Sequence, residues 1–139
     1  MTGEFAVAVH ALVYLNHRAQ TLCSEALAEN ICTNPARVRK VMARLKKAGL
    51  ITTREGAEGG YTFELDPKTV TLRRVAEAVE ASFVSASWRS GNPDMECLIA
   101  SGMADLLAGI YAELNESSLA RLEQITIADV DAQIFQNKK

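Results

Sequence analysis

The stretch NPARVRKVMARLKKAGL, residues 34–50, decides the fold of this chain. Asn34 followed by Pro35 predicts a helix start, because the asparagine side chain caps open backbone amides and proline needs no amide partner in the first turn. Gly49 predicts the helix end as a C-cap glycine. Between these ends, apolar residues recur at steps of three and four and predict one buried face: Val38, Val41, Met42, Leu45 and Ala48.

The remaining positions of this helix carry a concentrated positive charge. Arg37, Lys40, Arg44 and Lys47 share the predicted solvent side of the helix, and Arg39 and Lys46 flank it. Residues 33–60 hold seven basic and two acidic residues, a net charge of +5, whereas the whole chain has a net charge of −2. The segments before and after are acidic, so the near-neutral total conceals a polarised molecule.

The segments around the basic helix predict a winged helix-turn-helix domain. Helical spacing of apolar residues predicts helices over residues 4–17 and 24–31, with Ser24 as the N-cap of the second. The β-prone runs 50–54 and 61–65 flank a glycine-rich turn and predict a hairpin. Alternation along the second run predicts that Tyr61, Phe63 and Leu65 face the core. Thr71 is expected to cap a further helix that ends near residue 79.

The rest of the chain predicts a loop and two more helices. Serine, glycine and proline in residues 82–94 indicate a connecting loop. A stripe of apolar residues from Ile99 to Leu114 predicts a long helix whose apolar side is core or dimer seam, and residues 127–135 predict a short final helix. The expected organisation is a winged helix-turn-helix DNA-binding domain in residues 1–81, a connecting loop in residues 82–94, and a helical dimerisation and possible sensor region in residues 95–139. The fold class is mainly α with a small β-hairpin.

The basic helix indicates a nucleic-acid partner. In a winged helix-turn-helix, the second helix of the bihelical unit enters the major groove of double-stranded DNA. A basic helix by itself is often only a solvated surface. Here a capped turn precedes it, no acidic residue lies between residues 34 and 54, and a glycine hairpin follows it directly. These features together favour DNA binding.

Other classes of protein are less well supported. A winged-helix protein-interaction module, or a regulatory subunit that does not itself bind DNA, stays open as the alternative. An enzyme is not expected, because the chain lacks a phosphate loop and a glycine-serine-glycine nucleophile motif. No apolar run is long enough to span a membrane, and three cysteines suit a reducing compartment, so the protein is expected in the cytoplasm. His10 and His17 have no ligand partners at metal-binding spacing, so no metal is predicted.

These motifs resemble the BadM-type winged helix-turn-helix regulators of bacteria. That family includes the iron-sulfur cluster assembly regulator, the nitric-oxide-sensitive repressor and the cysteine metabolism repressor. The resemblance lies in FAVAVHALVYL, NPARVRKVMARLKKAGLI, the wing ending GGY, and ELDPKTVTLRRVAEAVE, and it covers residues 1 to about 80. It implies a homodimeric repressor or activator at a palindromic operator, with a long C-terminal helix as the dimer contact.

The resemblance also implies which residues contact DNA. Pro35, Arg37, Arg39, Lys40 and Arg44 would lie at or near DNA, and Gly59, Gly60 and Tyr61 would shape the wing. Combined with the charge pattern, the predicted DNA-binding set is Asn34, Pro35, Arg37, Arg39, Lys40, Arg44, Lys47, Arg54, Gly59 and Gly60. Glu55 and Glu58 stand in the wing where family members often carry arginine, so most of the affinity is expected from the helix.

The cysteines depart from the pattern of the cluster-binding members. Those members use three closely spaced cysteines in the loop and at the start of the long helix, and a cluster needs several thiolates. This chain has only Cys97 there, so no cluster built by that motif, and no other cofactor, is predicted. Cys97 is a possible redox sensor, with an inert cysteine as the alternative. Cys23 and Cys32 bracket the second helix and are expected to be buried thiols. The effector is unknown.

Overall fold

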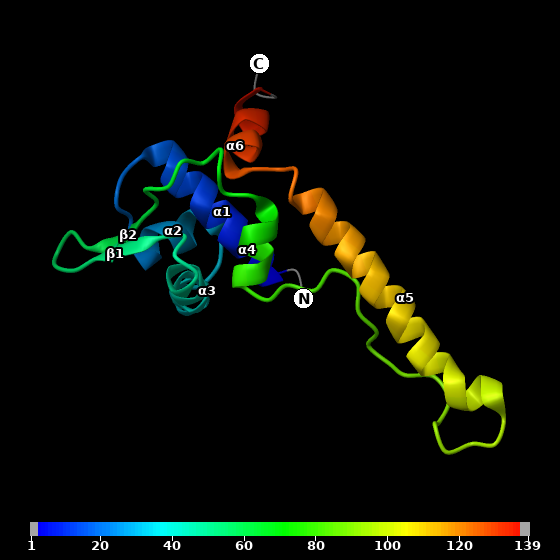
Figure 1. Ribbon diagram of the computed structural model, residues 1–139. Helices are drawn as coiled ribbons and strands as arrows, with labels where there is room; N and C mark the ends of the chain where they lie inside the picture. The colour runs from blue at the N-terminus through cyan, green and yellow to red at the C-terminus, as the bar shows by residue number, and fades with distance from the viewer. Residues whose placement is uncertain (1–2, 137–139) are drawn as a thin grey trace.

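The computed structural model describes residues 3–136, which form six helices and one two-stranded sheet (Figure 1). In chain order the elements are α1 (Gly3–Arg18), α2 (Ser24–Ile31), α3 (Pro35–Lys47), β1 (Thr52–Arg54), β2 (Gly60–Thr62), α4 (Leu72–Ala78), α5 (Leu98–Leu122) and α6 (Ile127–Gln136). The mainly α fold with a small hairpin and a long C-terminal helix is confirmed. Residues 137–139, the end of the predicted third region, lie outside the described residues.

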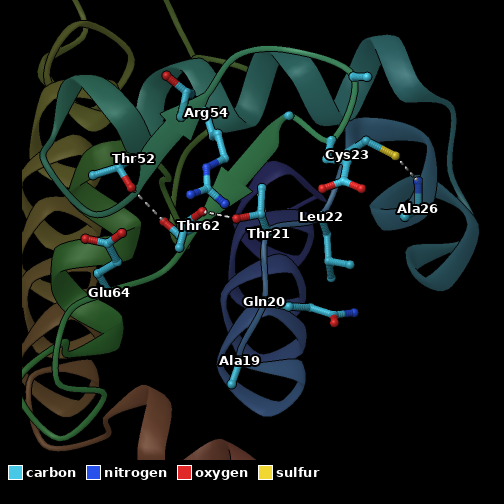
Figure 2. Close-up of a pocket in the computed structure, with 14 residues that line it drawn as sticks. Ala19, Gln20, Thr21, Leu22, Cys23, Ala26, Thr52, Arg54, Thr62 and Glu64 are labelled. Carbon is cyan, nitrogen blue, oxygen red and sulfur yellow. Dashed lines mark hydrogen bonds between the residues drawn. The ribbon is translucent and has the colours of Figure 1, made fainter.

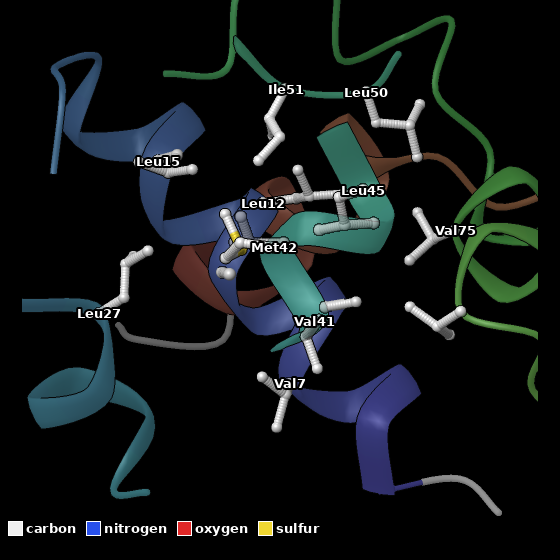
Figure 3. Close-up of a cluster of buried hydrophobic side chains, with 14 of the residues drawn as sticks. Val7, Leu12, Leu15, Leu27, Val41, Met42, Leu45, Leu50, Ile51 and Val75 are labelled. Atoms are coloured by element: carbon white, nitrogen blue, oxygen red, sulfur yellow. The ribbon is translucent and has the colours of Figure 1, made fainter. Parts of the chain in front are cut away.

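One hydrophobic core holds α3 against its neighbours (Figure 3). Val38, Val41, Met42 and Leu45 are completely buried and meet apolar side chains of α1, α2 and α4. Burying each such side chain stabilises the fold by about 1.5–3 kcal/mol, so this face fixes the orientation of the helix. Ala48, predicted on the same face, is exposed, because it is the C-cap residue at which the helix ends.

Both ends of α3 form as the sequence predicts. The Asn34 Oδ1 atom accepts a hydrogen bond from the Arg37 amide at 2.8 Å, and Pro35 is the first helical residue. Gly49 adopts φ +78°, its amide donates to the Lys46 carbonyl, and the Leu50 amide donates to the Leu45 carbonyl at 2.9 Å. This pair of bonds is a Schellman motif, which closes the helix and turns the chain toward β1.

The ends of α2 differ from the prediction. Cys23, not Ser24, is the N-cap residue, and its Sγ atom accepts from the Ala26 amide at 3.4 Å. Ser24 is the first helical residue and is buried. Cys32 caps the other end in a left-handed conformation. Because cap positions lie where a short helix meets solvent, both thiols are exposed, and the expectation of buried thiols was wrong.

The hairpin is attached to the start of the helix-turn-helix. Thr53 pairs with Tyr61 in the antiparallel β1–β2 register, and Leu22 and Tyr61 exchange two backbone hydrogen bonds of 3.0 and 2.8 Å. Tyr61 and Phe63 pack partly against the core. Leu65 is exposed, contrary to the predicted alternation, because the paired strand has ended at residue 62.

The two C-terminal helices, α5 and α6, lie in different environments. Helix α5 projects away from the body of the molecule (Figure 1), and none of its residues is buried. Helix α6 returns to the body and packs on α1, and Ile127 is completely buried in the core. The Ile127 amide donates to the Val70 carbonyl at 3.0 Å. Residues 125–136 therefore pack with the winged body, although the sequence analysis places them in the dimerisation and possible sensor region of residues 95–139. None of the described helices is long and apolar enough to cross a membrane.

Candidate nucleic-acid interface

The outward face of α3 is exposed, and the helix itself supplies no carboxylate to it. Its sequence, PARVRKVMARLKK, contains no acidic residue. Arg37, Arg39, Lys40, Lys46 and Lys47 are exposed, together with the small residues Ala36 and Ala43. Asn34 is exposed at the N-cap, and Pro35 is half-buried. The two alanines are small, so the helix can approach base edges closely, and the long cationic side chains around them can reach phosphates.

Arg44 does not share this solvent side, which corrects the predicted arrangement. Its Nη1 atom donates to Glu4 Oε2 at 3.2 Å and to the Val79 carbonyl at 2.9 Å. These partners belong to α1 and to the C-cap of α4. Arg44 thus lies on the flank of α3 that faces the rest of the fold, whereas Lys47 keeps its exposed position.

Arg39 lies on the opposite flank, next to the start of α2. Its Nη1 atom donates to Ser24 Oγ at 3.3 Å and lies 3.8 Å from Glu25 Oε1. A backbone hydrogen bond and the Ser24 hydroxyl lower the pKa of Glu25, and the charge of Arg39 lowers it further. The ionised Glu25 and the Ser24 hydroxyl therefore orient Arg39 before any ligand binds.

The wing contributes one cation and two structural glycines. Arg54 is exposed at the end of β1, and Glu55 and Glu58 are exposed in the turn. A Cβ atom on Gly59 would lie 2.4 Å from the Arg54 carbonyl oxygen, and one on Gly60 would lie 2.3 Å from the Leu22 carbonyl oxygen. Both glycines thus shape the wing by close backbone packing.

A polar groove of about 860 Å³ lies between the wing and the segment that joins α1 to α2 (Figure 2). Thr21, Thr52 and Thr62 line it, and the Thr21 and Thr62 hydroxyls are 2.7 Å apart. Arg54 and Glu58 lie on its wing side. Threonine hydroxyl groups are among the side-chain groups that contact phosphates in protein–DNA complexes. Sequence reasoning missed these threonines, because only the long-range pairing of Leu22 with Tyr61 brings them together.

Cys97 stands apart from this surface as the N-cap residue of α5. Its thiol is exposed, and the nearby backbone amides of Ala100 and Ile99 lower its pKa. Cys23 and Cys32 lie at the two ends of α2. Figure 1 shows α2 and the start of α5 at opposite sides of the molecule.

A helix-turn-helix with a wing and a cationic second helix defines the class of winged helix-turn-helix DNA-binding proteins. The family model Rrf2, described as an iron-dependent transcriptional regulator, matches residues 1–133. The chain belongs to this family and is a DNA-binding transcription regulator. The resemblance to the BadM-type regulators is thereby confirmed, and a module that does not bind DNA is not favoured.

Relatives of known name agree with this assignment. The HTH-type transcriptional regulator YwnA of Bacillus subtilis is 27% identical over 135 residues, which cover 97% of this chain and 99% of YwnA. The HTH-type transcriptional regulator IscR of Vibrio vulnificus is 28% identical over 135 residues, 91% of this chain and 80% of IscR. These relatives are named as regulators, not as enzymes.

Solved structures share the fold along the whole chain. A transcriptional regulator from Lactobacillus plantarum superimposes with a TM-score of 0.80 at 26% identity, covering 100% of both chains. The cysteine regulator CymR of B. subtilis superimposes with a TM-score of 0.65, covering 96% of both chains. Its identity of 16% means that this second likeness shows the fold alone.

The family description mentions iron, which a protein holds through several donor side chains that lie close together. Iron–sulfur clusters are held by several thiolates, or by thiolates and histidines together. Among residues 3–136, no three His, Cys, Asp or Glu side chains lie close enough to hold a metal ion. The donor groups of this described part of one chain do not fit a protein-bound cluster.

Proposed function

We propose that this regulator is a homodimeric repressor that binds a palindromic operator through α3. The observation that carries the proposal is that α3 contains six basic residues and no acidic one, with Arg37 and Arg39 exposed near its N-terminal end. Early residues of a recognition helix are those that reach base edges. Lys40 in the middle of the helix, Lys46 and Lys47 at its end, and Arg54 in the wing are suited to phosphate contacts. The regulator would act in the cytoplasm, where bacterial DNA lies.

The projecting helix supports the dimer. Helix α5 has 25 residues and no buried side chain. Five of its large apolar side chains are between 43% and 85% exposed: Leu98, Ile99, Leu106, Ile110 and Leu114. A long helix gains most of its stability by burying an apolar face, and extended apolar surface marks an interaction site. Pairing with α5 of a second copy would cover these side chains and would set the distance between the two α3 helices.

The paired α3 helices would occupy successive major-groove segments on one face of the DNA. Half-sites of such a dimer lie about one helical turn apart, roughly 34–36 Å. Occupation of a promoter by the dimer would block access of the transcription machinery. Residues 82–97 and the start of α5 connect the dimer helix to the winged body, and we propose this region, with Cys97, as the place where a signal is received.

Selection of bound fragments from fragmented genomic DNA tests the proposal. The wild-type protein is expected to enrich an inverted repeat with half-sites about one helical turn apart, and to sediment as a dimer. Affinity for the enriched repeat should fall steeply between 50 and 200 mM salt, because phosphate contacts release counterions. Recovery of fragments without a shared motif, or of single half-sites bound by a monomer, would contradict the proposal.

A further inference from the structure

A single carboxylate bridges two cations of the recognition helix. Glu4, in the first turn of α1, places Oε1 3.3 Å from Lys40 Nζ and Oε2 3.2 Å from Arg44 Nη1. Arg44 also donates to the carbonyl of Val79 at 2.9 Å. One flank of α3 is therefore tied to the N-terminal end of α1 and to the C-terminal end of α4.

The two halves of this cluster differ in exposure. The side chains of Glu4 and Arg44 are 29% and 37% exposed, whereas that of Lys40 is 62% exposed. Glu4 lies at the positive end of the α1 dipole, and Arg44 lies at the negative end of the α4 dipole. Each dipole therefore stabilises the charge at its end. The Glu4–Arg44 contact is thus the fixed part of the cluster. Lys40 is the member that solvent, or a ligand, can reach.

We propose that Glu4 is an internal counterion that competes with DNA phosphates for Lys40, and that Arg44 is a positioning residue for α3. This inference rests on the proposed function, in which α3 binds DNA. A phosphate that takes Lys40 must displace Glu4, and the freed carboxylate then attracts a cation from solution. Lys40 therefore contributes less to counterion release than an unpaired lysine on the same face. Arg44, held by two contacts, keeps its place when DNA binds.

The consequence is a DNA affinity that is lower, and less sensitive to salt, than the number of cations on α3 suggests. Each phosphate contact contributes about 0.9 to the slope of log affinity against log salt. Because Lys40 is already paired with Glu4, its contact with a phosphate contributes less than this full amount to the slope in each protomer. Because phosphate contacts carry no sequence information, Glu4 would weaken operator and non-operator binding alike.

The substitution Glu4→Gln tests this role directly. Glutamine keeps an oxygen that accepts from Arg44 but removes the charge that holds Lys40. Titration of a duplex of arbitrary sequence at several salt concentrations should give a slope steeper by up to about 0.9 per protomer, and affinity at 0.1 M salt tighter on the order of tenfold. Glu123→Gln is the matched control, since it removes the same charge from an exposed carboxylate at the C-cap of α5 that pairs with Arg73 and not with a cation of α3; its slope should equal that of the wild type. Thermal melting and sedimentation of each variant check the fold and the dimer.

A second comparison does not depend on altering α1. Lys40→Ala should reduce the salt slope less than Lys47→Ala, because only Lys40 is already paired with a carboxylate. Equal reductions, or a Glu4→Gln slope that matches the wild type, would overturn the inference while leaving DNA binding by α3 intact. Absence of salt-dependent DNA binding by the wild-type protein would instead overturn the proposed function, and the inference with it.

Discussion

At the level of single residues, contacts between distant segments decide which charges of α3 can reach a ligand. Arg44 and Lys47 follow the same periodicity in the sequence, yet Arg44 bonds to Glu4 and Val79 while Lys47 is exposed. Periodicity predicted the buried side chains Val38 and Leu45 correctly, because the apolar face of a helix follows from spacing alone. It could not predict the partner of Arg44, which lies 40 residues away along the chain.

Cys97 provides a residue-scale prediction about pH. The amides of Ala100 and Ile99 stabilise its thiolate and lower its pKa, so in the folded protein the reactive thiolate forms at lower pH than for an ordinary cysteine. Alkylation of Cys97 by iodoacetamide, followed across pH by mass spectrometry of the Cys97 peptide, should show a midpoint shifted to lower pH. The same peptide in urea-unfolded protein is the control. Identical midpoints in the folded and unfolded protein would rule out this stabilisation.

At the level of elements, local signals placed the ends of α3 correctly but misplaced the N-cap of α2 and the inward end of the hairpin. Asn34 and Gly49 act within one turn of chain, and both ends of α3 form where those residues predict. Leu65 was expected inside from alternation but is exposed, since the length of a strand depends on its partner. The return of α6 to α1 through Ile127 also depends on long-range packing and left no periodic signal.

The wing provides an element-scale prediction about stability. Gly60→Ala would place a Cβ atom 2.3 Å from the Leu22 carbonyl oxygen, in a backbone conformation with φ +152° that side chains disfavour. The wing must then separate from Leu22, and we expect a loss of about 1–3 kcal/mol in the free energy of unfolding. Urea denaturation measures this loss. Equal stability of the Gly60 variant and the wild type would mean that the wing does not need this close approach.

At the level of the whole molecule, charge and apolar surface are separated. The basic segment of residues 33–60 forms the second helix of the helix-turn-helix and the wing, whereas five exposed large apolar side chains lie on α5. Helix α5 projects away from the body of the molecule (Figure 1). One end is therefore suited to DNA and the other to a second copy of the chain. The class and the family could be predicted from the sequence, because the caps, the basic helix and the glycine hairpin are local patterns. The projection of α5 could not be predicted, since the spacing of apolar residues does not distinguish a face buried in the core from one that contacts a second copy of the chain.

The most direct test of the central claim is the affinity of the double variant Arg37→Ala/Lys40→Ala for the selected operator. Both residues lie at the early, exposed part of α3, so their loss should lower operator affinity by about a hundredfold or more, toward the affinity for unrelated DNA. Lys68→Ala/Arg121→Ala removes the same charge from exposed sites outside α3 and should bind like the wild type. Melting temperature and dimer content should be unchanged in both variants. Tight, sequence-specific binding retained by the Arg37→Ala/Lys40→Ala variant would contradict the assignment of α3 as the DNA-reading helix.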